Sequence, residues 1–143
     1  MNGNRLILIV DDSVPLRSAM RELIVASMPA CSCAEASTGE EAVELARDLG
    51  PDVVVMDLKL PGINGIAATR RIKAMLPQTP VVMVSLFDAA EFQAQAAEAG
   101  VVAFVPKRVM HRELIPLLEA LLGSRNSDPA GRDARLQAGG ADE

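Results

Sequence analysis

Residues 6–17, LILIVDDSVPLR, do most to decide the fold. Residues 6–10 are Leu or Ile at four positions and Val at the fifth, which is typical of a strand buried on both faces. The run ends in Asp11 and Asp12, and two such charges about 4 Å apart repel by roughly 4 kcal/mol at an effective dielectric near 20. Two interpretations stay open: Asp11 ends the strand and Asp12 or Ser13 caps the next helix, or a cation binds there.

Four further apolar runs follow, and helical patterns separate them. The runs are residues 31–36, which is the weakest, 53–56, 81–84 and 101–105. Thr38 and Glu41 fit a capping box at the start of the second helical pattern. Strict alternation of buried strands with helices indicates a parallel sheet covered by helices on both faces. We therefore expect an α/β fold with a doubly wound (βα)5 sheet.

Composition limits the classes of function. Half of the 143 residues are apolar, which is enough for one domain with a sizeable core. The net charge of −5 argues against direct nucleic acid binding by this chain. With no apolar run of about 18 residues and no signal-like start, we expect a cytoplasmic protein without a membrane segment. Cys31 and Cys33, with only one distant His, predict reduced core cysteines and not a zinc site.

Polar residues stand directly after the apolar runs, at the strand ends where such sheets bind ligands. They are Asp11 and Asp12 after the first run, Asp57 after the third, Ser85 after the fourth and Lys107 after the fifth. Singly, Asp57 could cap a turn, Ser85 could cap a helix and Lys107 could be a solvated loop cation. Together, three carboxylates, a hydroxyl and an ammonium on one edge predict a site for a divalent metal and a phosphoryl group.

Magnesium chemistry assigns a role to each acid. Mg²⁺ prefers oxygen ligands and is usually held by one or two carboxylates, waters and phosphate oxygens. Asp12 and Asp57 suit direct ligation, and Asp11 suits ligation through water. A carboxylate also accepts phosphoryl groups as an aspartyl phosphate, which makes Asp57 the candidate nucleophile.

These residues carry a resemblance to a known family. From about Asn4 to Leu122 the chain resembles the receiver domain of two-component response regulators, through "VDDS", "DLKLPGINGI", "VVMVS" and "PK" in order. The stretch "NGIAATRRIKAM" is similar to the NarL/FixJ (LuxR-type) branch, whose receivers usually precede a helix-turn-helix output domain. The resemblance implies a flavodoxin-like fold with strand order 2-1-3-4-5. It also implies a phosphoprotein of signal transduction and transcription regulation.

The resemblance also implies roles for individual residues. Asp57 would be the phosphoacceptor, and Asp11 and Asp12 would complete the Mg²⁺ site with the backbone carbonyl of Lys59. Lys107 would pair with the phosphoryl group.

Two further residues would form the switch that the resemblance implies. Ser85 would follow the phosphoryl group by hydrogen bonding, and the rotamer of Phe104 would report the active state. The change would reach the face formed by the fourth helix, the fifth strand and the fifth helix.

The chain departs from the family pattern near the site. The family often has Ala after the Ser or Thr, and this chain has Leu86 and then Phe87, whose bulk could screen the phosphoryl group from water. Lys59 is a second cation that could attract phosphate or block access. Arg108 follows Lys107 where the family usually has Pro, which favours a trans bond because a non-proline cis bond costs roughly 2.5–4 kcal/mol.

Partners and boundaries follow from the same resemblance. The phosphoryl donor would be a sensor histidine kinase or a phosphotransfer protein, and the output domain or partner would lie outside this chain. Self-association, through the switch face or another helical face, stays open. Residues 1–123 would form the receiver domain and residues 124–143 a flexible linker or tail. A free-standing receiver and the front of a longer regulator are both compatible with this division.

We expect the switch to be no enzyme in the usual sense, since it would only promote its own phosphorylation and dephosphorylation. Two other classes of function compete with it. A haloacid dehalogenase-type phosphatase also uses Asp and Mg²⁺, but "DDS" offers no second acid two residues on. A receiver-like interaction module without phosphorylation predicts a missing acid or Lys, and all five positions are filled. His111 has no second His or Cys nearby, so we expect it to be a surface residue.

Overall fold

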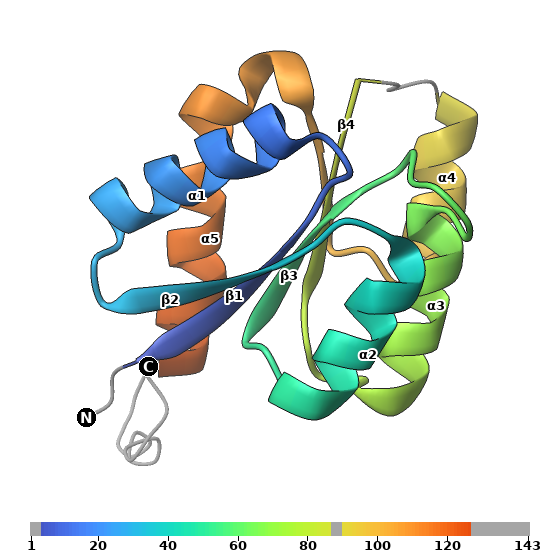
Figure 1. Cartoon of the computed structure of the whole chain (residues 1–143), viewed down its shortest axis with the longest axis horizontal. Coiled ribbons are helices and arrows are strands. Elements are labelled where there is room, and N and C mark those ends of the chain that lie inside the picture. Colours follow the sequence, from blue (N-terminus) through green and yellow to red (C-terminus); the bar gives the residue numbers. More distant parts are fainter. Residues whose placement is uncertain (1–3, 87–89, 127–143) are drawn as a thin grey trace.

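The five apolar runs form one parallel sheet in the computed structural model, which describes residues 4–86 and 90–126 (Figure 1). The strand order is β2-β1-β3-β4-β5, which confirms the predicted topology. The strands are β1 (Arg5–Val10), β2 (Cys31–Ala36), β3 (Val53–Asp57), β4 (Val81–Ser85) and β5 (Ala103–Pro106). The last strand begins two residues later than predicted, because the Val101 amide closes the preceding helix by donating to the Ala96 carbonyl, 3.0 Å away.

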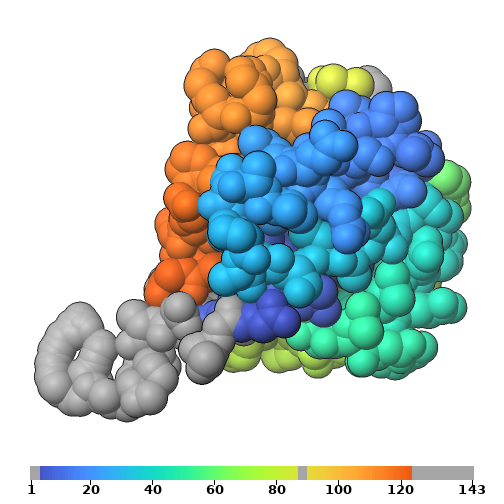
Figure 2. Space-filling view, turned by 60° about the vertical axis from the view of Figure 1, so that its left-hand side comes forward, coloured from blue at the N-terminus to red at the C-terminus, as the bar shows by residue number. Residues whose placement is uncertain are grey.

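Helices cover both faces of the sheet. They are α1 (Val14–Ser27), α2 (Gly39–Leu49), α3 (Gly65–Met75), α4 (Ala90–Ala99) and α5 (Met110–Asn126), with a 3₁₀ turn, η1, at Lys107–Val109. α1 and α5 lie on one face, and α2, α3 and α4 lie on the other (Figure 1). Figure 2 looks onto α1 with α5 beside it. No helix in residues 4–86 and 90–126 is long and apolar enough to span a membrane.

Each strand alternates between two apolar layers. In β1, Ile7 and Ile9 pack with the α1 and α5 side, whereas Leu8 and Val10 pack with the α2, α3 and α4 side. All four are at most 1% exposed, which accounts for the continuous apolar run. Cys31 and Cys33 are free thiols and lie half-buried against the α1 and α5 layer. The structure therefore places both cysteines at the margin of the core and not inside it, where the sequence predicted them.

Side chains cap the helices that start beside the carboxyl edge of the sheet. Ser13, and not Asp12, caps α1, and its Oγ accepts from the Leu16 N–H at 3.3 Å. Thr38 caps α2 as predicted, since its Oγ1 accepts from the Glu41 N–H at 3.0 Å. The second bond of a capping box is absent: the Glu41 carboxylate instead accepts from the Ser37 N–H at 2.8 Å. The Ser37 hydroxyl donates to the same Glu41 oxygen at 3.2 Å, so Ser37 supplies two hydrogen bonds to this carboxylate.

Close packing holds the loop between β3 and α3. The Gly65 N–H donates to the Leu58 carbonyl at 2.8 Å, and a Cβ at Gly65 would collide with the Asp57 carbonyl oxygen. On the other side, Glu40 of α2 accepts from the Ile63 N–H at 3.3 Å. Contacts with α2 and α3 therefore fix the chain where it leaves β3.

The backbone contact at Gly65 makes this residue intolerant of a side chain. We expect Gly65→Ala to lower the free energy of unfolding by about 2–3 kcal/mol, because backbone cannot move aside as a flexible side chain can. Gly123→Ala in α5 is the matched control: its Cβ meets nothing within 4 Å, so helix propensity should raise stability by up to about 1 kcal/mol. Urea unfolding measures both, and equal effects would contradict the close approach.

Candidate functional site

A pocket of about 240 Å³ opens at the carboxyl edge of the sheet. Its walls are Asp11, Asp12, Ser13, Leu16, Asp57, Lys59, Leu86 and Lys107. These residues come from the last residue of β3, from the segments that follow β1, β3, β4 and β5, and from the first turn of α1. The predicted convergence of strand-end residues is confirmed for both acidic loops and for the lysine.

Three carboxylates meet in this pocket. One oxygen from each of Asp11, Asp12 and Asp57 lies within 4.8 Å of the others. Asp11 is 0% exposed and Asp57 is 5% exposed, while Asp12 faces solvent. Ser13 caps the helix, which confirms the first interpretation of the "DDS" stretch, and the two acids before it join a cluster that could hold a metal ion.

Lys107 compensates the charge of the two buried acids. Its Nζ lies 2.8 Å from Asp11 Oδ2 and 3.3 Å from Asp57 Oδ2, and its side chain is 6% exposed. A solvated loop cation, the alternative left open by the sequence, is therefore wrong. No peptide bond in the described ranges is cis, so the bond from Lys107 to Arg108 is trans, as expected.

The Asp57 carboxyl has an unusual affinity for protons. Burial, and after it the negative charge of Asp11, raises its pKa to about 6. The ammonium of Lys107 lowers the pKa but does not cancel the effect of burial. A buried carboxylate that lies beside another negative charge and lines an open pocket is suited to bind a cation or to attack an electrophilic group.

Every polar atom of Asp11 is engaged. Its N–H donates to the Ala36 carbonyl at 3.1 Å, which continues the pairing of β1 with β2. Its Oδ1 accepts from the Ser13 N–H at 2.9 Å, and its Oδ2 faces Lys107. Its backbone carbonyl accepts from Arg17 Nη1 at 2.7 Å. Asp11 is therefore held rigidly in place before any ligand arrives.

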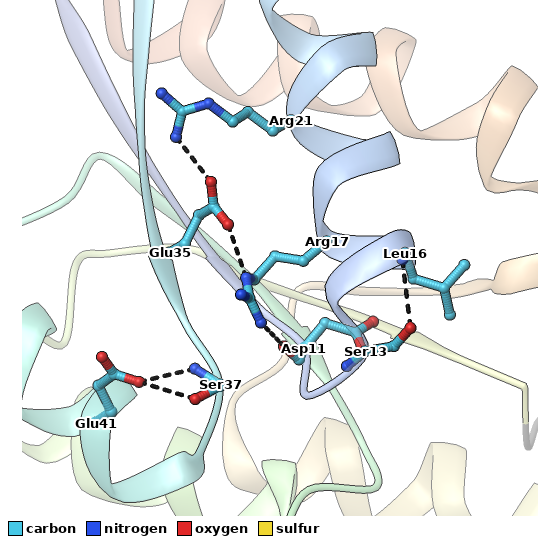
Figure 3. Close-up of polar contacts among 8 residues, drawn as sticks. All are labelled: Asp11, Ser13, Leu16, Arg17, Arg21, Glu35, Ser37 and Glu41. Carbon is cyan, nitrogen blue, oxygen red and sulfur yellow. Dashed lines mark hydrogen bonds and ion pairs between the residues drawn. The ribbon is translucent and has the colours of Figure 1, made fainter.

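Arg17 belongs to a network that the sequence did not reveal (Figure 3). Its Nε donates to Glu35 Oε1 at 2.7 Å, and Arg21 Nη1 donates to Glu35 Oε2 at 2.8 Å. The hydrogen bond from Arg17 lowers the pKa of Glu35, so this carboxylate stays ionised. One signal was available in principle, because parallel pairing of β1 with β2 places Glu35 opposite Ile9, two residues before Asp11.

Ser85 and Phe104 do not line the pocket. Ser85 ends β4 fully buried and pairs in register with Pro106. Phe104 lies half-buried on β5 against the α2, α3 and α4 layer. Leu86 lines the pocket and is 68% exposed, whereas Phe87 lies outside the described residues. His111 is exposed, as predicted.

Comparison with known proteins gives matches over most of the chain. The family model for the response regulator receiver domain matches residues 7–119. Response regulator GacA of Pseudomonas aeruginosa is 31% identical over 124 residues, which cover 86% of this chain and 58% of that protein. The uncharacterized transcriptional regulatory protein YxjL of Bacillus subtilis is 31% identical over 121 residues, covering 84% of this chain and 56% of YxjL. The chain thus spans a little over half the length of these curated relatives.

Solved structures share the fold of this chain. A LuxR-family two-component response regulator from Aurantimonas sp. SI85-9A1 is 35% identical with a TM-score of 0.78, covering 85% of this chain and 86% of that one. The response regulator domain of Thermotoga maritima CheB is also 35% identical, with a TM-score of 0.72. The match covers 87% of this chain and 98% of the CheB domain.

The raised pKa of Asp57 predicts a pH-dependent cost of folding. The unfolded carboxyl ionises near pH 3.8 and the folded one near 6, so the cost is absent below pH 3.8 and complete above pH 6. Without metal, Asp57→Asn should therefore raise the free energy of unfolding at pH 7.5 by about 1–3 kcal/mol. The gain should vanish near pH 4, and Mg²⁺ should shrink it at pH 7.5 by stabilising the wild type alone.

Urea unfolding in chelator between pH 4 and 8 checks this expectation. Asp48→Asn is the control, because that carboxylate is 58% exposed and lies on α2, away from the pocket. A gain for Asp57→Asn that is the same at pH 4 and pH 7.5 would show that ionisation of Asp57 does not burden the fold.

Proposed function

Because the chain belongs to the response regulator receiver domain family, we propose that it is a phosphoaccepting signalling switch with Asp57 as the acceptor. One observation carries the proposal: Lys107 lies between Asp11 and Asp57 at 2.8 and 3.3 Å, with the Asp12 carboxylate beside them. This arrangement places a nucleophilic carboxylate next to a cation and a metal-type oxygen cluster. The phosphoryl donor would be a sensor histidine kinase or a phosphotransfer protein.

The donor set fits Mg²⁺. The clustered groups are carboxylate oxygens, the ligands that Mg²⁺ prefers, and a ligand set of few carboxylates leaves positions for water and phosphate oxygen. Asp12 and Asp57 would bind the ion directly, Asp11 through water, and Lys59 through its backbone carbonyl. The bound ion would neutralise charge on the transferring phosphoryl oxygens.

The chemistry at Asp57 is a group transfer. A carboxylate oxygen attacks phosphorus, and the bond from phosphorus to the donor nitrogen or oxygen breaks, so that the donor leaves with that electron pair. Lys107 stays in place to balance the added charge, which is about −1.5 to −2 for a phosphoryl group. The same residues would promote the later attack of water on the phosphorus, so the chain serves one signal per phosphorylation.

Ser85 and Phe104 would carry the signal away from Asp57. Ser85 ends β4, which pairs with β3, and Phe104 lies on the next strand, β5, packed against the layer of α2, α3 and α4. Reorienting them would alter the face formed by α4, β5 and α5. That face would act on an output domain or a partner outside this chain, or on a second copy. The transcriptional regulatory protein YxjL favours transcription regulation as the output, and we propose that the chain acts in the cytoplasm.

Phosphorylation of a single residue separates this proposal from its alternatives. With radiolabelled acetyl phosphate and Mg²⁺, the wild type should incorporate about one phosphoryl group per chain, and Asp57→Asn should incorporate none because Asn lacks the nucleophilic oxygen. Asp48→Asn should label like the wild type. Lys107→Ala should label slowly and should be less stable without metal, because it leaves two buried acids unpaired.

The other outcomes assign the chain to different classes. Labelling of Asp57→Asn at the wild-type level would place the acceptor elsewhere and overturn the proposal. Rapid multiple turnover on varied phosphate esters would indicate a phosphatase. No labelling of the wild type by acetyl phosphate or by phosphorylated donors would indicate an interaction module.

Leu86 is proposed to control access of water to the phosphoryl group, because it lines the pocket and is 68% exposed. Leu86→Ala should therefore shorten the half-life of phosphorylated protein severalfold and leave Mg²⁺ affinity unchanged, since the ligands lie on other loops. Val102→Ala is the matched control, another exposed aliphatic residue that does not line this pocket. Decay of label after removal of the donor measures the effect, and an unchanged or longer half-life would reduce Leu86 to a packing residue.

A further inference from the structure

Arg17 connects two parts of the molecule at the back of the acidic cluster. Its Nη1 donates to the backbone carbonyl of Asp11 at 2.7 Å, and its Nε donates to Glu35 Oε1 at 2.7 Å (Figure 3). The side chain is only 16% exposed, so these bonds are shielded from solvent more than a surface ion pair is. The guanidinium thereby links the first turns of α1, the edge strand β2 and the loop after β1.

The carbonyl that Arg17 holds belongs to the peptide between Asp11 and Asp12. A peptide unit is planar, so fixing its carbonyl also fixes the direction in which the chain leaves toward the Asp12 Cα. Asp11 does not depend on this bond alone, because its N–H and both carboxylate oxygens have their own partners. Asp12 is exposed, and its position relative to Asp11 depends on how that one peptide is turned.

We propose that Arg17 is a positioning residue that holds the Asp12 carboxylate in the geometry needed for Mg²⁺, with Glu35 holding Arg17 in turn. The inference rests on the proposed function, since it concerns the same metal site. Groups that orient metal ligands typically change metal affinity by 10- to 100-fold when they are removed. Arg17 acts through Asp12 and touches neither the metal nor the phosphoryl group.

The chain offers a matched control in Arg21. This residue binds the other oxygen of the Glu35 carboxylate at 2.8 Å and, within the described residues, its hydrogen bonds reach Glu35 and not Asp11. Removing Arg21 also deletes one cation and one Glu35 bond. A difference between the two arginine variants therefore isolates the contact with the Asp11 carbonyl from charge and from the network as a whole.

Calorimetric titration of the unphosphorylated full chain with Mg²⁺ tests the proposal. Arg17→Ala should weaken Mg²⁺ binding by about tenfold or more, and Arg21→Ala should change it less than about twofold. Arg17→Lys keeps the charge but lacks the planar fork that reaches Glu35 and Asp11 together, so it should also bind Mg²⁺ more weakly. Glu35→Gln should weaken binding by an intermediate factor, because Arg17 keeps a neutral partner.

A second readout separates positioning from loss of structure. The rate at which Asp57 is labelled by acetyl phosphate should be low for Arg17→Ala at limiting Mg²⁺ and should return to near the wild-type rate at saturating Mg²⁺. Thermal melts in chelator identify any variant that is not folded, and if Arg17→Ala is unfolded, the comparison of Arg17→Lys with Arg21→Ala decides the question.

The outcomes distinguish this inference from the proposed function. Equal Mg²⁺ affinity of the folded Arg17 variants and Arg21→Ala, with normal binding by the wild type, would overturn the positioning role alone. A labelling defect that persists at saturating Mg²⁺ would also overturn it. Failure of the wild type to bind Mg²⁺ at millimolar concentration would overturn the metal site and the inference with it.

Discussion

The ammonium of Lys107 makes the acidic site compatible with a folded protein. Asp11 and Asp57 are both buried, and without a cation between them their repulsion and desolvation would act against the fold. Lys107 offsets this cost only in part, because the pKa of Asp57 remains raised to about 6. The site therefore keeps uncompensated negative charge, and this charge is what makes a divalent cation a fitting ligand.

The loops that carry the acids are held from behind by separate contacts. At the end of β3, close packing of Gly65 against the Asp57 carbonyl and the bond from Ile63 to Glu40 fix the chain. At the end of β1, Arg17 binds the carbonyl between the two acids. In both cases these contacts fix the backbone, and the carboxylate lines the pocket. The rigid surroundings thereby keep the like charges close together.

Much of the site was predictable because its residues follow apolar runs directly. The run before Asp11 and the run before Asp57 place both carboxylates at the same sheet edge once the strands are parallel, and Lys107 follows by the same argument. The capping box at Thr38 was right in its first bond and wrong in its second, because Ser37 offers Glu41 two donors. The role of Arg17 left no pattern of its own, since an arginine on an amphipathic helix normally faces solvent.

The sequence by itself determined which segments form strands and helices and which polar residues stand at the strand ends. Apolar periodicity and capping are properties of neighbouring residues, so they can be read along the chain. Only the tertiary structure decided that Lys107 lies between two buried acids and that Arg17 meets Glu35 beneath the Asp11 carbonyl. These contacts depend on strand order, on register and on the docking of α1, which bring together residues as far as 96 positions apart in the chain.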